Sequence, residues 1–367
     1  MRVGPASPPN PFAVAVADAA AQVGHPRPHD ISSGLDVGLG LVDLTIVDGR
    51  RQTAADAYLR PVMGRVNLHV VTGAVVRRLL VTGGRCSGVE YEHGGATVIA
   101  HASGEVVLAA GVVGSPQLLM LSGIGPKDHL TALGVDTLVD APGVGANFHD
   151  HPMAGVVWSA ARPLPPAEFN HSEVLGLVHS PLADASGVPD LQLLSVDIPW
   201  LPPTMTGPPH GYNINVSVMA PRSRGSVRLA SSDPTVAPLV DPNYFADDHD
   251  LAVMIAGLRM AREIGAAPAL DVWREHEVLP GPDVQDDAAL REYLRAVVGP
   301  YWHGVGTCAM GIGDDAVVDA ELRVRGVDGL RVADASVMPT IVSANTNATV
   351  LAIAEKAAQL LTDGRVM

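Results

Sequence analysis

The sequence predicts a mixed α/β (α+β) fold, with a core built from both ends of the chain and a mixed-sheet domain inserted between them. Three observations support this fold class. Short segments rich in β-branched residues, separated by glycine-containing turns, fill residues 66–110, and a continuous apolar segment then leads into a helix. A strand, a loop and a long helix follow one another over residues 329–367. Alternation between strand and helix patterns is typical of α/β domains.

The first 60 residues are rich in proline and predict a single helix among loops. The alanine-rich, amphipathic segment from Phe12 to Val23 predicts that helix, and Gly24 and Pro26 predict its end. Four strands forming a β-meander are then expected, because turn residues separate the apolar runs. The expected strands are residues 68–71, 74–81, 88–91 and 97–100.

A fifth strand is expected at residues 105–110, where an unbroken apolar run indicates burial on both faces. Gly111 predicts the end of this strand. Ser115 and Pro116 predict the start of a short helix over residues 117–121, with the serine as N-cap and the proline as the first helical residue.

The middle of the chain, residues 151–245, is rich in proline and is expected to be mostly irregular. Regular structure is expected to return towards the C-terminus. The elements predicted from residue 151 onward are strands at 212–219, 225–229 and 330–333 and helices at about 248–265, 286–298 and 348–361.

The composition narrows the class of protein. The 367 residues carry a net charge of −15, and 47% are hydrophobic, so a disordered chain is excluded. A negative surface repels phosphate and only 4% of residues are aromatic, so we expect no nucleic-acid partner.

Two widely separated cysteines, Cys86 and Cys308, indicate a reducing, cytoplasmic setting. We expect no signal peptide and no membrane span, because the longest apolar run, residues 106–121, is interrupted by glycine, serine and proline.

Two segments in the first half of the chain carry patterns of a functional site. At residues 111–126, the preceding apolar strand runs into a glycine turn and a helix N-terminus, the geometry that accepts a phosphate or another anionic group. A plain strand–helix corner explains the same residues equally well. In residues 141–152, His149 and His151, with Asp150 between them, could suggest a metal. Alternate residues in a loop lack a further ligand nearby, so we predict no metal site.

Two further segments lie in the second half. Residues 301–311 place His303 beside a run of small residues that lets another group approach the backbone closely. Histidine is the usual general base, although histidines that serve only packing are more common. Asp334, followed by the amides of Asn345 and Asn347, offers polar groups to a cofactor, and an Asx turn accounts for the same residues. Residues 304–309 satisfy G-x-G-x-x-A but follow no strand, so they are not a dinucleotide fingerprint.

In this order and spacing, these segments resemble the glucose–methanol–choline (GMC) family of FAD-dependent oxidoreductases, and its choline dehydrogenase-like members in particular. The resemblance covers nearly the whole chain and is weakest at about residues 155–210. The matching segments are residues 111–126 (the second signature), 142–152 (the P-G-V-G-x-N-x-x-D-H-P loop), 221–229 with 241–245 (the start of the C-terminal domain), 303–307 (the catalytic histidine) and 334–339 (the closing flavin segment).

The resemblance implies how the chain is divided and what it does. Residues 1–155 and 301–367 would form a partial, Rossmann-like FAD-binding domain, and residues 156–300 an inserted, antiparallel-sheet domain for the substrate. The implied reaction is oxidation of the CH–OH group of a small alcohol, with FAD as cofactor and an unidentified final electron acceptor.

The resemblance also implies roles for individual residues. His303 would accept the alcohol proton while hydride passes to flavin N5, and Asn345 would hydrogen-bond the substrate oxygen. The implied cofactor contacts are Val76 at the adenine, Gly111 in the glycine turn, Asp334 and Ala335 at the ribityl and pyrophosphate part, and Asn347 at the flavin pyrimidine.

One departure from the family pattern affects the cofactor. Family members open with a strand, a G-x-G-x-x-G turn and a helix that hold the FAD pyrophosphate, and this sequence lacks that fingerprint. We therefore expect a fragment, a separate chain that carries the FAD-binding half, or loss of flavin, with weak or no FAD retention by this chain alone. A non-catalytic remnant or binding subunit is the alternative from a different functional class, and a lyase on the same scaffold is an alternative among enzymes.

Overall fold

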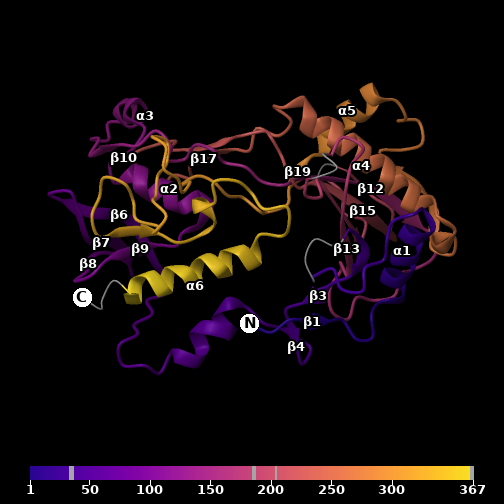
Figure 1. Cartoon of the computed structure of the whole chain (residues 1–367), viewed down its shortest axis with the longest axis horizontal. Coiled ribbons are helices and arrows are strands. Elements are labelled where there is room, and N and C mark those ends of the chain that lie inside the picture. The colour runs from indigo at the N-terminus through magenta and orange to yellow at the C-terminus, as the bar shows by residue number, and fades with distance from the viewer. Residues whose placement is uncertain (33–36, 184–186, 203–204, 364–367) are drawn as a thin grey trace. The chain divides into compact units, whose positions relative to one another are not determined.

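The structure is a computed structural model that describes residues 1–32, 37–183, 187–202 and 205–363 (Figure 1). The chain divides into two compact units, each assembled from three stretches of sequence. The first unit comprises Met1–Val70, Pro152–Pro221 and Asp247–Tyr301, and the second comprises Val71–His151, Arg222–Ala246 and Trp302–Met367. The sequence predicted that residues 1–70 belong to one domain with residues 71–155. In the structure, residues 1–70 pack in the first unit and residues 71–151 in the second.

An antiparallel sheet forms the centre of the first unit, with the strand order β18-β12-β15-β14-β13-β2, and β19 also pairs with β12. Strands β12 and β15 pair from Met153↔Ser217 to Ser159↔Gly211. The bounds are β2 Gly38–Leu41, β12 Pro152–Ala160, β13 Val174–Val178, β14 Leu191–Val196, β15 Gly211–Val218, β18 Arg274–Leu279 and β19 Gly299–Pro300.

The expectation that residues 151–245 are mostly irregular was wrong, because it missed β12, β13 and β14. Every residue of β12 is buried, so this strand lacks the polar–apolar alternation by which a half-exposed strand is recognised. Its proline, Pro152, stands at the first position, where a strand tolerates the missing N–H.

Helices cover this sheet. α4 (Asp248–Ala266) packs across β12 and β15, and α1 (Pro11–Gln22) packs against α4. The approach of α4 is close, because a Cβ on Gly257 would lie 2.3 Å from a methyl carbon of Val216. α5 (Asp287–Val297) packs beside α4, and all three helices confirm the sequence-based predictions to within a few residues.

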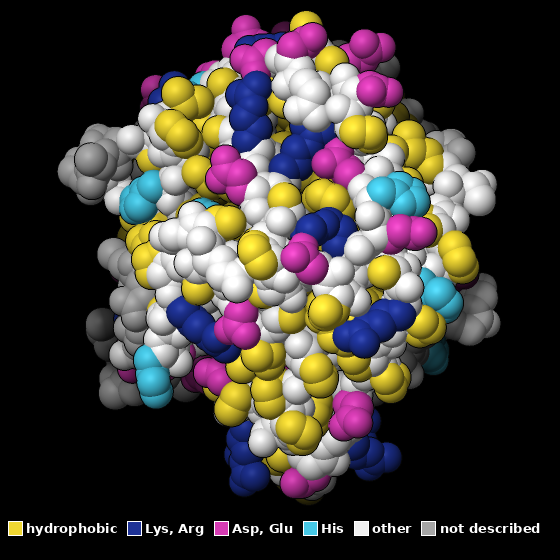
Figure 2. Space-filling view, turned by 90° about the vertical axis from the view of Figure 1, so that its right-hand side faces the viewer, with side chains coloured by type: hydrophobic (Ala, Val, Ile, Leu, Met, Phe, Trp, Pro, Cys, Tyr) yellow, Lys and Arg dark blue, Asp and Glu magenta, His cyan; other side chains and the backbone are white. Residues whose placement is uncertain are grey.

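Short elements complete the first unit. They are β1 Gly4–Pro5, β3 Asp43–Leu44, β4 Ile46–Val47, β5 Arg50–Arg51, a π-helical turn Ala55–Leu59 and 3-10 turns Arg60–Val62 and Pro268–Leu270. Figure 2 shows basic and acidic side chains interspersed over one face of the molecule. Ion pairs of this unit include Arg262–Glu277 and Arg259–Asp287. No helix among the described residues is both long and apolar enough to cross a membrane.

The second unit contains the expected β-meander of β6, β7 and β8, and a parallel pair of β9 and β20 (Figure 1). Residues 68–71 are not a strand, since they pair with no neighbour, and Val70 and Val71 are exposed. Strand β9 is shorter than predicted and is not buried on both faces, because Val107 is 38% exposed. The bounds are β6 Ala74–Thr82, β7 Arg85–His93, β8 Ala96–His101, β9 Val106–Leu108 and β20 Leu330–Val332.

Helices and short strand pairs surround the β9–β20 pair. A core that includes Leu119, Met120, Cys308 and Val332 lies between them. The remaining elements are α2 Gly111–Leu121, β10 Ile124–Gly125, α3 Lys127–Ala132, β11 Val139–Asp140, β16 Ser226–Arg228, β17 Leu239–Asp241, the 3-10 turn η4 Ala335–Val337 and α6 Asn347–Asp363.

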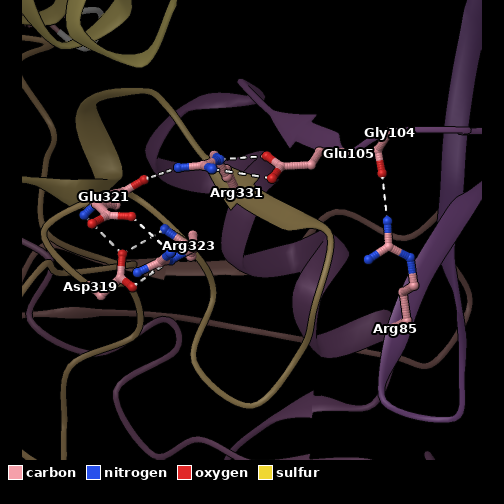
Figure 3. Close-up of polar contacts among 7 residues, drawn as sticks. All are labelled: Arg85, Gly104, Glu105, Asp319, Glu321, Arg323 and Arg331. Atoms are coloured by element: carbon pink, nitrogen blue, oxygen red, sulfur yellow. Dashed lines mark hydrogen bonds and ion pairs between the residues drawn. The ribbon is translucent and has the colours of Figure 1, made fainter. Parts of the chain in front are cut away.

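A network of charged side chains holds β20 beside the start of β9 (Figure 3). The guanidinium of the buried Arg331 donates to both carboxylate oxygens of Glu105, at 2.5 and 3.1 Å, and to the backbone carbonyl of Glu321. Arg323 bonds Asp319 and Glu321 nearby. The register Leu330↔Val106 therefore has both main-chain and side-chain support, and it brings Gly111 and Asp334 to the same end of the pair.

Candidate active site

Asp334 ties the segment after β20 to the start of α2. One carboxylate oxygen of this buried residue accepts bonds from the Gly111 amide at 3.0 Å and the Ser115 hydroxyl at 2.6 Å. The other oxygen accepts the Ser336 amide at 2.8 Å and its hydroxyl at 2.5 Å. The carboxylate is therefore fully engaged within the chain. Its bonds explain why Gly111, Asp334 and Ala335, three of the predicted cofactor residues, lie together.

Helix α2 begins earlier than predicted, at Gly111, and Pro116 lies inside it rather than at its first position. Ser115 is not the N-cap, because it lies inside the helix and Ala110 is the N-cap. The Ser115 hydroxyl donates to Asp334 instead. A proline within a helix leaves the carbonyl four residues earlier without its N–H partner. That carbonyl belongs to Val112, and the Thr307 hydroxyl donates to it at 2.6 Å. The segment that follows His303 thus completes the hydrogen bonding of this helix.

Asp150 organises the backbone around His303. One oxygen of its carboxylate accepts the amides of His303 and His151, both at 2.8 Å. The other accepts the Tyr244 hydroxyl at 3.0 Å. Burial raises the pKa of the Asp150 carboxyl, and these hydrogen bonds act in the opposite direction. The residue that the sequence offered only as a weak metal ligand therefore holds two histidines in place, and the described residues contain no group of three metal-binding side chains.

The rings of His151 and His303 form a chain of hydrogen bonds with a defined direction. A backbone carbonyl can only accept, so His151 Nε2, 3.1 Å from the Val342 oxygen, carries a hydrogen. In the neutral ring, His151 Nδ1 is then an acceptor. It lies 2.9 Å from Nδ1 of His303, which must donate.

This direction leaves Nε2 of His303 as the basic nitrogen. Nε2 lies 3.4 Å from the side-chain nitrogen of Asn345, which donates to it. Burial lowers the pKa of His303 to about 4, so the ring is neutral at pH 7. Asn345 is exposed. The structure brings the two predicted catalytic residues within hydrogen-bond distance of each other.

A second set of contacts fixes the segment that leads to Asn345. The ring of His149 lies 2.6 Å from the Asn147 carbonyl oxygen through Nδ1, and its Nε2 accepts the Ile341 amide at 2.8 Å. The Asn147 side chain donates to the Pro339 carbonyl at 3.1 Å. The sequence suggested His149 only as a weak metal ligand and gave Asn147 no role of its own, although both lie in the P-G-V-G-x-N-x-x-D-H-P loop.

The other predicted cofactor residues lie on three different elements. Val76 is half-buried on β6, where it pairs with Tyr91 of β7. Asn347 is the first residue of α6 and is exposed. Ala335 opens the 3-10 turn after Asp334 and is half-buried.

Comparison with known proteins gives consistent matches along the chain. Family models described as GMC oxidoreductase match residues 1–153 and 221–354. Choline oxidase from Arthrobacter globiformis is 40% identical over 98% of this chain and 68% of its own length, and an oxygen-dependent choline dehydrogenase from Rhizobium etli is 37% identical over 95% and 68%. The crystal structure of pyridoxine 4-oxidase from Mesorbium loti superimposes with a TM-score of 0.92 and 37% identity, over 97% of this chain and 71% of that one. Together with the ordered motifs, these matches show that the chain belongs to the GMC oxidoreductase family.

Proposed function

We propose that this chain carries the proton-accepting site of an FAD-dependent oxidoreductase that oxidises the CH–OH group of a small alcohol. The family supports FAD as the cofactor. The observation that carries the proposal is the directed hydrogen-bond chain from the Val342 carbonyl through His151 to His303, which ends at a basic nitrogen beside the Asn345 amide.

The residues of this chain perform the acid–base part of the reaction. The alcohol hydroxyl donates its proton to Nε2 of His303 as the C–H bond breaks. The side-chain amide of Asn345 donates to the same oxygen and stabilises the charge that develops there. His303 keeps its Nδ1 hydrogen on His151 throughout, so the ring holds its orientation while it becomes charged. Bound FAD supplies the hydride acceptor.

The backbone at Gly111 and at the start of α6 fits such a cofactor. Gly111 has a φ of +77°, and nothing lies within 4 Å of the position that a Cβ would take there, so a ligand can approach the backbone closely. The N-terminus of the 17-residue helix α6 begins with the exposed Asn347 and Ala348, and its first amides have no partner within the helix. We propose that Gly111, Ala335 and Asn347 hold the flavin, as the family pattern implies.

The similar proteins indicate the class of substrate. Choline and pyridoxine, for which two of them are named, both carry a primary alcohol. We therefore propose a small primary alcohol as the substrate.

The test is anaerobic reduction of the flavin by alcohol, with the chain supplied with excess FAD and a panel of small alcohols. His303→Ala should slow reduction by about 10²- to 10⁴-fold, the usual contribution of a general base. Asn345→Ala should slow it less. Reduction at an unchanged rate in His303→Ala would refute the assignment, and binding of alcohols without any flavin reduction in the wild type would favour a non-catalytic binding subunit.

A further inference from the structure

We infer that His149 and Asn147 are positioning residues, which set the distance between the His303 ring and the Asn345 amide by clamping the backbone of residues 339–341. The inference rests on the proposed function, because it assigns these two side chains a task in that same site. Neither residue is a catalytic residue, since their polar atoms bond the protein itself.

His149 connects two backbone segments through both of its ring nitrogens. Nδ1 lies 2.6 Å from the Asn147 carbonyl oxygen, which can only accept, so Nδ1 carries the hydrogen. Nε2 is then an acceptor, and it receives the Ile341 amide at 2.8 Å. The ring is 1% exposed and burial lowers its pKa to about 4, so it is neutral at pH 7. Only the neutral ring in this tautomer makes both bonds.

Asn147 adds a second connection to the same segment. Its side-chain nitrogen donates to the Pro339 carbonyl at 3.1 Å and lies 3.5 Å from the Gly306 carbonyl. Its side-chain oxygen accepts a hydrogen bond from Nε of Arg224 at 3.0 Å. This bond determines that the nitrogen end of the amide faces Pro339. The residue has a φ of +56°, a conformation that asparagine tolerates better than most residues.

The same loop also holds the segment that carries His303. The backbones of His149 and Val305 exchange two hydrogen bonds, of 3.2 and 2.9 Å. A Cβ on Gly306 would lie 2.2 Å from the Asn147 oxygen and 2.8 Å from a ring carbon of His149, so only glycine lets the two segments lie this close. Residues 147–149 thus contact both backbones that present the catalytic pair.

The geometry of the pair explains why the clamp affects catalysis. The contact between His303 Nε2 and Asn345 is already 3.4 Å long, near the limit of a hydrogen bond. A shift of a few tenths of an ångström in the segment before Asn345 would break it. Because the amide stabilises charge that develops during the reaction, such a shift should lower kcat more than it raises KM.

The experiment compares His149→Leu with His149→Gln in the full chain. Leucine removes both ring contacts, whereas glutamine retains one donor and one acceptor. A matched control is His129→Leu, because His129 on α3 also accepts a backbone amide, that of Leu229 at 3.2 Å, on an element without catalytic residues. Asn147→Gly provides a second variant, since glycine keeps the positive φ while removing the amide.

The primary measurement is hydrogen exchange at residues 339–345 without substrate, followed by kcat and KM for alcohol oxidation. In His149→Leu and Asn147→Gly we expect exchange at Ile341 to rise at least about tenfold and kcat to fall about tenfold, with KM nearly unchanged. His149→Gln should restore most of the slow exchange at Ile341 and most of kcat. His129→Leu should change neither the exchange rate nor kcat.

Three outcomes would overturn the inference: unchanged exchange at Ile341 in both variants, faster exchange with unchanged kcat, or an equal effect of His129→Leu. If His149→Leu does not fold, Asn147→Gly and His149→Gln give the same comparison. If the wild-type protein oxidises no alcohol, the proposed function fails, whereas the exchange measurement still tests whether the clamp exists.

Discussion

At the scale of single residues, the main finding is that hydrogen bonds to backbone carbonyls determine the tautomers of three histidines. His149 and His151 each face a carbonyl that only accepts, and His303 takes its tautomer from His151. The sequence predicted His303 and Asn345 as a pair through the family motifs. It could not predict the tautomers, because they depend on Val342 and Asn147, whose carbonyls carry no side-chain signal.

The pKa of His303 leads to a prediction for the pH dependence of the reaction. A base accepts a proton only while it is neutral, and burial lowers the pKa of this ring to about 4. The rate constant for flavin reduction, measured at limiting alcohol concentration, should therefore rise between about pH 3 and pH 5 and stay level through pH 6.5. An acid limb centred near pH 6.5, the ordinary value for histidine, would contradict this prediction.

At the scale of elements, helix α2 shows how one side chain compensates for a residue that usually ends a helix. Pro116 removes a donor, and the Thr307 hydroxyl replaces it at the Val112 carbonyl. The sequence alone favoured a helix that starts at Pro116, since proline is common in the first turn. The replacement donor lies 195 positions away in the sequence, so no local pattern could reveal it.

This compensation predicts a specific coupling between two substitutions. Thr307→Val should lower the free energy of unfolding by about 1–3 kcal/mol, because it leaves the Val112 carbonyl without a donor. In a Pro116→Ala background, the restored N–H should make the same substitution less costly. Urea unfolding of the four proteins of this cycle measures the coupling, and Thr307→Ser, which keeps the hydroxyl, is the control. An equal loss of unfolding free energy on Thr307→Val in both backgrounds would contradict the predicted coupling.

Among the other elements, the sequence predicted those with an amphipathic pattern and clear ends. α4 begins at Asp248 after Asp247, whose side chain caps the helix by accepting the His249 amide, and α1 begins after Asn10, which caps Phe12 in the same way. Strands β12 and β14 were missed because they are buried on both faces, and residues 68–71 were wrongly predicted as a strand because β-branched residues favour strands only where a partner strand exists.

At the scale of the whole molecule, the buried neutral histidines predict acid lability. Burial lowers the folded-state pKa of His149 and of His303 to about 4, while the unfolded chain retains an ordinary value near 6.5. Between these values the unfolded state binds more protons than the folded state, so stability rises with pH. The stability that these two neutral histidines contribute is therefore fully present above pH 6.5 and declines as the pH falls towards 4.

The measurement is the urea midpoint of unfolding between pH 7.5 and pH 4. The midpoint should fall over this range, and the fall should be shallower in His149→Gln, since glutamine does not titrate. A midpoint that is constant down to pH 4.5, or an identical slope in the variant, would contradict the prediction.

The pairing of β9 with β20 has a consequence for biosynthesis. Val106 pairs with Leu330, and every proposed catalytic and positioning residue belongs to the unit that contains this pair. A ribosome must therefore translate beyond Asn345 before the His303 ring and the Asn345 amide can come together. Until then the β6–β8 meander and α2 lack the segments that they pack against, so we expect chaperones to bind this half of the chain during synthesis.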